Sequence, residues 1–171
     1  DAAARETIGN LSGGGATGGN VTLNGNTLTT GDASNTSFAG VMSGAGALTK
    51  QGSGTFTLSG ANTYTGATTV NAGTLSLAGG AAIANTGAVV LANVAGATLN
   101  LAASETIGNL SGGGATGGNV TPNGNTLTTG DASNTSPATV QRGPGALASQ
   151  RRGPSPPAQR STPPTRPTDP A

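Results

Sequence analysis

Short stretches of alternating hydrophobic and polar residues recur along most of the chain. In each of them two apolar residues flank a single residue, which in most cases is polar, and this is the period of a β-strand with one buried face. The clearest pairs are Val21 and Leu23, Phe56 and Leu58, Leu75 and Leu77, Val89 and Leu91, and Leu99 and Leu101. Glycine, asparagine and serine lie between the pairs and favour turns. Because no segment has the i, i+3, i+4, i+7 spacing of a helix, the pattern predicts an all-β chain of short strands and corners.

A long internal repeat is the strongest signal in the chain. The stretch ETIGNLSGGGATGGNVTLNGNTLTTGDASNTS at residues 6–37 returns at residues 105–136 with one change, from Leu23 to Pro122. Near-identity over this length indicates recent duplication of a block that contains several structural units. Self-similarity at a fixed offset is the sequence signature of solenoid proteins.

The composition favours a β-solenoid, also called a parallel β-helix, over a β-sandwich. Only Phe38, Phe56 and Tyr64 are aromatic among 171 residues, whereas 31 residues are glycine. Charged residues make up 8% of the chain, against a usual share of about 25%. A sandwich fills its core with bulky and aromatic side chains, but a solenoid coil needs only one small or medium residue pointing inward from each strand. Threonine and asparagine suit its outer faces, where identical polar side chains stack between coils.

One stretch, GVMSGAGALTKQGSGTFTLSGANTYTGATTVNAGTLSL at residues 40–77, carries a family resemblance. The matching residues are Leu48, Thr49, Lys50, Gly52, Gly54, Thr55, Leu58, Ser59, Gly60, Asn62, Thr63, Tyr64, Gly66, Val70, Gly73, Thr74 and Leu75. The stretch resembles the autotransporter-associated β-strand repeat, also called the passenger-associated transport repeat. Phe56 stands where this family usually has leucine, which keeps the position apolar.

The resemblance implies a right-handed parallel β-helix in the passenger of a type V secreted protein. Such passengers cross the outer membrane of a Gram-negative bacterium with the help of a C-terminal β-barrel. The implied location is therefore the bacterial cell surface or the medium, and the implied partner is a barrel translocator outside this chain. The chain opens without an initiator Met or an apolar leader, so we expect an internal fragment whose targeting signal lies upstream.

The C-terminal part differs in composition from the rest. All ten prolines lie at or after Pro122, and nine lie at or after Pro137. Because proline lacks the N–H that an interior strand donates, we expect the β-helix to cover residues 1–136 and a Pro/Arg-rich tail to cover residues 137–171. The tail is either a disordered, semi-extended linker or the product of a reading-frame slip in GC-rich DNA. Aligned with the first copy, it still matches at seven of the fourteen positions from 137 to 150.

The residues that could carry chemistry favour no reaction. The chain has no cysteine and no histidine, which excludes disulfides, thiolate metal sites and a Ser-His-Asp triad. The GGGATG stretches at residues 13–18 and 112–117 fit G-x-G-x-x-G, but no predicted helix follows them as a dinucleotide site requires. We therefore expect glycine-rich corners there. No enzymatic activity, cofactor or small-molecule substrate is predicted, and no residue is assigned as catalytic, cofactor-binding or metal-binding.

The few charged residues also have simple interpretations. Glu6 and Glu105 are equivalent positions of the repeat, as are Asp32 and Asp131, and we expect all four to be solvent-exposed on corners. The stretch DASNTS at residues 32–37 has oxygen ligands but lacks the glycine and glutamate of an EF-hand loop. The tail contains five arginines, without the interleaved aromatic residues that stack on nucleic acid, and no nucleic-acid partner is expected. These are Arg142, Arg151, Arg152, Arg160 and Arg166.

The predicted function is structural. We expect a stalk segment of an autotransporter passenger that supports export and surface display, with adhesion as a further role whose ligand no patch identifies. The alternative is a polar β-solenoid that binds a repetitive surface, such as ice or a glycan. Thr-x-Thr pairs occur at Thr27/Thr29, Thr55/Thr57, Thr63/Thr65 and Thr126/Thr128. Their uneven spacing argues against the flat threonine face that this alternative needs.

Overall fold

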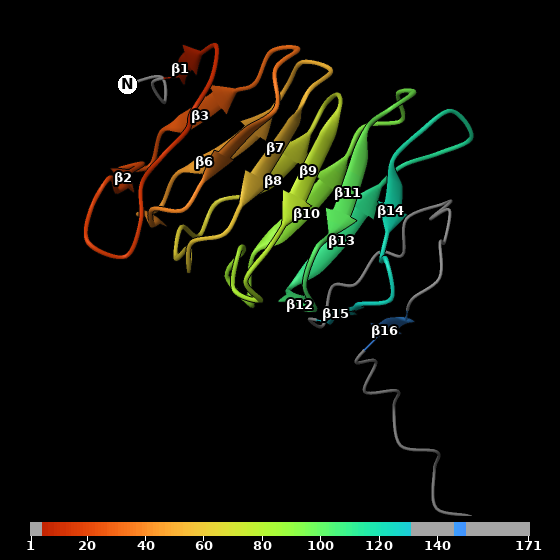
Figure 1. The fold of residues 1–171 in the computed structure, drawn as a ribbon. Coiled ribbons are helices and arrows are strands. Elements are labelled where there is room, and N and C mark those ends of the chain that lie inside the picture. Colours follow the sequence, from red (N-terminus) through yellow and green to blue (C-terminus); the bar gives the residue numbers. More distant parts are fainter. Residues whose placement is uncertain (1–4, 131–145, 150–171) are drawn as a thin grey trace, which may run out of the picture.

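The structure is a computed structural model that describes residues 5–130 and 146–149 of the chain (Figure 1). These residues form sixteen short strands and no helix, and every pair of neighbouring strands is parallel. The fold is an all-β parallel solenoid, which confirms the prediction from the alternating pattern.

Each turn of the solenoid passes through three sides. Sheet A consists of β1 (Arg5–Ile8), β3 (Thr27–Thr30), β6 (Ala47–Lys50), β8 (Thr68–Val70), β10 (Ala88–Leu91) and β13 (Asn109–Gly112). Sheet B consists of β4 (Thr36–Phe38), β7 (Thr55–Leu58), β9 (Thr74–Leu77), β11 (Thr98–Leu101) and β14 (Asn119–Thr121). The third side carries β2 (Val21–Thr22) and β5 (Met42–Ser43), and further along β12 (Glu105–Ile107), β15 (Thr126–Thr129) and β16 (Ala146–Ser149). Since sheet A has one strand per turn, its six strands correspond to about six turns.

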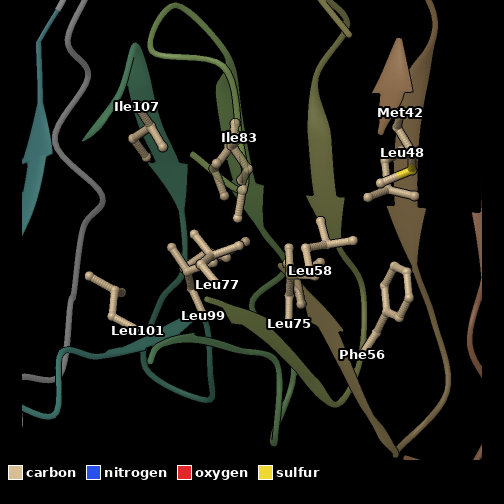
Figure 2. Close-up of a cluster of buried hydrophobic side chains, with 14 of the residues drawn as sticks. Met42, Leu48, Phe56, Leu58, Leu75, Leu77, Ile83, Leu99, Leu101 and Ile107 are labelled. Atoms are coloured by element: carbon tan, nitrogen blue, oxygen red, sulfur yellow. The ribbon is translucent and has the colours of Figure 1, made fainter. Parts of the chain in front are cut away.

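The core is a set of apolar rows that run along the inside of the solenoid. On sheet B, the strand register places Leu58 beside Leu77 and Leu77 beside Leu101. The parallel row two residues earlier joins Phe56, Leu75 and Leu99 in the same way. All of these side chains are buried, and Figure 2 shows them pointing into the space between the sheets. A thin core of single leucines therefore replaces the aromatic core of a sandwich.

An asparagine holds the coils together where the third side has no strands. The Oδ1 atom of Asn62 accepts a hydrogen bond of 2.7 Å from the N–H of Met42 in the preceding coil. Its Nδ2 atom donates one of 2.8 Å to the carbonyl of Ala82 in the following coil. Together with backbone hydrogen bonds at the same corner, such as the one of 3.0 Å from the N–H of Asn62 to the carbonyl of Ala81, this buried side chain keeps three consecutive coils in register.

The duplicated block occupies different sides in its two copies. Strand β1 lies on sheet A, but its equivalent 99 positions later, β12, lies on the third side. Strand β3 on sheet A likewise corresponds to β15 on the third side, and β2 on the third side corresponds to β14 on sheet B. The local register is nevertheless the same, since Glu6 pairs with Leu28 and Glu105 pairs with Leu127. The duplication thus advances the solenoid by four full turns and two of the three sides.

One strand lies beyond the boundary that the prolines predict. Strand β16 (Ala146–Ser149) pairs in parallel with β15, with Leu147 beside Leu127. It is the equivalent of β6 in the first copy, which pairs in the same register with β3. This strand falls in the part of the tail that still matches the first copy. The rest of the predicted tail, residues 137–145 and 150–171, lies outside the described residues.

Candidate functional site

The two GGGATG segments include the same tight glycine turn at a corner. The N–H of Gly15 donates to the carbonyl of Gly18 over 2.9 Å, and the N–H of Gly114 donates to that of Gly117 over 2.8 Å. No helix follows either segment among the described residues. The N–H groups of Gly15, Gly18 and Gly114 bond within the turn, and those of Gly13 and Gly113 donate to carbonyls of a neighbouring coil. Neither segment therefore has the arrangement that cradles a dinucleotide.

The carboxylate of Asp32 bonds within its own corner and to the preceding coil. It is exposed and accepts hydrogen bonds of 2.6 Å from the N–H of Ser34 and from the side-chain amide of Asn10. The backbone hydrogen bond from Ser34 is the main cause that lowers the pKa of Asp32. In the same segment Asn35 accepts a bond of 2.7 Å from the N–H of Thr55. Within the described part of the chain no three residues of the His, Cys, Asp or Glu types gather as metal ligands would, and Asp131 lies outside that part.

The expectation that both repeat glutamates are exposed is wrong for Glu105. Glu6 is exposed on β1, but Glu105 on β12 is 3% exposed and its carboxylate lies inside the solenoid. The two oxygens of Glu105 accept hydrogen bonds from the N–H groups of Ala82, at 3.1 Å, and Ile83, at 3.3 Å. Burial raises the pKa of Glu105, and these two hydrogen bonds oppose the rise. The carboxylate binds the preceding coil at a corner where no strand supplies carbonyl acceptors.

Lys50 is a second buried charge, which the sequence did not lead us to expect inside the core. It belongs to β6, is 1% exposed and lies in register between Thr30 and Val70. Its ammonium group donates to the carbonyls of Gln51 at 2.7 Å, Gly52 at 2.8 Å and Ala72 at 3.2 Å. Burial lowers the pKa of Lys50, and the nearby charge of Asp32 opposes the change. The ammonium thus supplies three donors to carbonyls of two successive corners.

Tyr64 is a further buried side chain with a polar group, and it lies on the third side. Its hydroxyl lies 2.6 Å from the hydroxyl of Thr68 at the start of β8. Burial raises the pKa of Tyr64 to about 12, the hydrogen bond with Thr68 lowers it, and the charge of Glu105 raises it. Lys50, Tyr64 and Glu105 each contact backbone or a neighbouring hydroxyl inside the solenoid, so this arrangement stabilises coils rather than presenting a reactive group.

The outer surface of sheet B carries a regular array of polar side chains. We call this array the sheet B ladder; its rungs are the strands, and its side chains form two rows. The first row is Thr55, Thr74, Thr98 and Asn119, and the second is Ser37, Thr57, Ser76, Asn100 and Thr121. Uneven loop lengths between the strands do not disturb this alignment. The Thr-x-Thr pairs of the sequence do not share one face, since Thr55/Thr57 lies on sheet B, Thr27/Thr29 on sheet A and Thr126/Thr128 on the third side. The aligned rows of sheet B combine Thr55 and Thr57 with residues outside these pairs.

Sheet A carries a less complete array. Thr7, Thr29, Thr49 and Thr69 are in register along four successive strands, and Val90 follows them in the same row. The neighbouring outward row contains Arg5, Ala47 and Ala88. The hydroxyl pattern on this side is interrupted by a charge and by apolar side chains.

These features define the class of the protein as a parallel β-solenoid whose polar groups serve the contacts between coils. Residues 48–77 match the family model described as passenger-associated-transport-repeat, a repeat found in autotransporter passengers, which confirms the resemblance stated above. The matched residues run from β6 to β9 and thus cover one full turn and one further side. No curated protein and no solved structure matches the chain. The described residues include no helix that is long and apolar enough to span a membrane.

The glycines of the repeat lie where successive coils leave no room for a side chain. A Cβ atom at each of them would collide with a backbone carbonyl oxygen of the preceding coil. These glycines are Gly52, Gly54, Gly60, Gly66 and Gly73. The corners of successive coils approach too closely for any side chain, so the repeat spacing records the places where the backbone stacks on itself.

Proposed function

We propose that this chain is a stalk segment of an autotransporter passenger, which supports export and holds other parts of the passenger away from the bacterial surface. The observation that carries the proposal is the match of residues 48–77 to a passenger repeat, within a solenoid that extends on both sides of the match. Its partner in export is a β-barrel translocator outside this chain. No enzyme family is indicated, and the role we assign is mechanical.

The contact pattern suits folding during export. Every strand pairs with the strand one turn before or after it on the same side. Solenoids of this kind fold by adding one coil to the coils already formed. Folding outside the membrane can then proceed coil by coil as the chain emerges. The absence of cysteine means that no disulfide can form before the chain has crossed.

Surface display of the chain in a Gram-negative host tests this proposal. The 171-residue chain is placed between a signal peptide and an autotransporter β-barrel, with an epitope at its N-terminus, and display is measured as epitope accessibility on intact cells. Leu77→Asp puts a carboxylate among buried leucines, whereas Thr74→Asp puts one on the outer face of the same strand. We expect the parent and Thr74→Asp to be displayed and Leu77→Asp to be displayed poorly. Retention of the parent in the periplasm, or equal display of Leu77→Asp, would contradict the proposed role.

A further inference from the structure

The sheet B ladder has a property that a stalk does not require. The strands that carry its two full rows, β7, β9, β11 and β14, lie side by side in the order of the turns (Figure 1). Their sequences are TFTL, TLSL, TLNL and NVT, and none contains a charged residue. Every outward side chain on these four strands is a hydroxyl or an amide. The inward positions between them are all apolar and buried.

Hydrogen bonds orient side chains in the second row of the ladder. The amide nitrogen of Asn100 donates to the hydroxyl of Ser76 over 3.0 Å, and that of Asn123 donates to Asn100 Oδ1 over 2.6 Å. The threonines are β-branched, which restricts the side-chain torsion next to the backbone. Most ladder side chains are half-buried between their neighbours rather than extended into solvent. Ser76, in the middle of the second row, is buried beneath its neighbours, with 6% of its surface exposed. The positions of the hydroxyl groups are therefore set by the backbone.

The spacing of the array follows from the geometry of a parallel sheet. Successive rungs lie about 4.7–4.9 Å apart, and the two rows lie roughly 6.6 Å apart because they are separated by two residues of one strand. The array therefore repeats in two directions over the length of the sheet. A partner that uses this regularity must itself be periodic, uncharged and able to exchange hydrogen bonds at every rung.

We propose that the sheet B ladder is an ice-binding surface. The face of an ice crystal presents the O–H groups of water in a regular array and carries no charge, which matches a regular array of hydroxyl and amide groups without charged side chains. A glycan fits less well, because sugar rings are commonly held by stacking on aromatic side chains. Phe38, Phe56 and Tyr64, the only aromatic residues of the chain, are all buried. Each hydrogen bond is weak, so binding depends on many rungs acting together.

Incorporation of the purified 171-residue chain into a slowly growing ice hemisphere tests the proposal, with inhibition of ice recrystallisation as a second readout. The disrupted variant is Thr57→Tyr with Thr98→Tyr, which places two rings above the ladder and keeps residues that favour strands. The matched control is Thr49→Tyr with Thr69→Tyr on the outer face of sheet A. Circular dichroism of each variant establishes that the fold is retained.

We expect the parent and the sheet A variant to enter the ice and to slow recrystallisation, and the sheet B variant to lose both effects. If the tyrosine pair on sheet B prevents folding, Thr98→Lys is used instead, since a lysine extends its charge into solvent without filling the core, and it should cause the same loss. Exclusion of the folded parent from ice overturns the proposal. Equal losses from the two sheets also overturn it, and so does binding to insoluble glucan or chitin particles without any entry into ice.

Discussion

Glu6 and Glu105 have the same sequence neighbours on their C-terminal side, yet Glu6 is exposed and Glu105 is buried against the N–H groups of Ala82 and Ile83. Both point to the inner side of their strands, as their pairing with Leu28 and Leu127 shows. Strand β1 lies at the edge of sheet A, so no described coil covers Glu6. The coil that contains Ala82 covers Glu105. The environment of the glutamate is therefore decided by its coil and not by its local sequence.

The burial of Glu105 predicts that this residue makes the free energy of unfolding depend on pH. Burial raises the pKa of Glu105, so the native state holds this proton to a higher pH than the unfolded chain. The stabilisation is complete below the unfolded pKa of about 4.3 and is lost as the pH rises through the folded pKa. Relative to the parent, Glu105→Gln should lose less stability over this rise, as measured by urea unfolding at a series of pH values from about 4 to 8.

The equivalent variant Glu6→Gln is the control for this experiment. It makes the same chemical change in the same sequence context, but at an exposed side chain. We expect it to change the free energy of unfolding by no more than about 0.5 kcal/mol, as exposed substitutions usually do. A Glu105→Gln pH profile that follows the parent would show that the buried carboxylate does not titrate as its surroundings imply.

We expect the hydrogen bonds of the Lys50 ammonium group to contribute to the free energy of unfolding. Lys50→Met keeps most of the apolar stem but removes the three hydrogen bonds to Gln51, Gly52 and Ala72. Leaving these part-buried carbonyls without a donor costs up to about 3 kcal/mol, which should appear as a lower urea midpoint. Thr49→Ala, on the outer face of the same strand, should change the free energy of unfolding by no more than about 0.5 kcal/mol. Equal effects of the two variants would mean that solvent satisfies these carbonyls.

The inner leucines of sheet B should carry the stability of the solenoid. Leu77 is fully buried and lies between Leu58 and Leu101 in the central row. Leu77→Ala should lower the free energy of unfolding by about 2–5 kcal/mol, because the rigid coils cannot collapse into the cavity. Thr57→Ala, on the outer face of β7, is the matched control and should have a much smaller effect in the same urea titration.

The fold could be predicted from the sequence because the alternation of apolar and polar residues along each strand decides it. Pairs such as Phe56 and Leu58 reveal which residues of a strand point inward, and the glycine corners limit the strand lengths. The same alternation contained a signal for the buried charges, since Lys50 has the phase of Leu48 and Glu105 has that of Ile107. The phase alone does not predict their burial, because charged residues are rarely buried unless they are paired.

The outer faces could not be predicted in the same way. Strand β7 begins 19 residues before β9, whereas β9 begins 24 residues before β11, and only the structure shows that loops absorb the difference. The alignment of Thr55, Thr74 and Thr98 therefore depends on hydrogen bonds between coils. The change of side between the two copies was hidden for a similar reason, because 99 residues do not make a whole number of turns.

Close stacking of the corners predicts that the repeat glycines tolerate no side chain. A Cβ at Gly54 would collide with the carbonyl oxygen of Ser34 in the preceding coil, and both partners are backbone held in register. Gly54→Ala should therefore destabilise the chain by about 1–3 kcal/mol, the usual cost of overpacking. A Cβ at Gly18 meets nothing within 4 Å, so Gly18→Ala should be neutral or stabilise by up to about 1 kcal/mol. Thermal unfolding followed by circular dichroism separates the two variants. A Gly54→Ala chain as stable as Gly18→Ala would mean that the coils can move apart, and the glycine spacing of the repeat would then need a different cause.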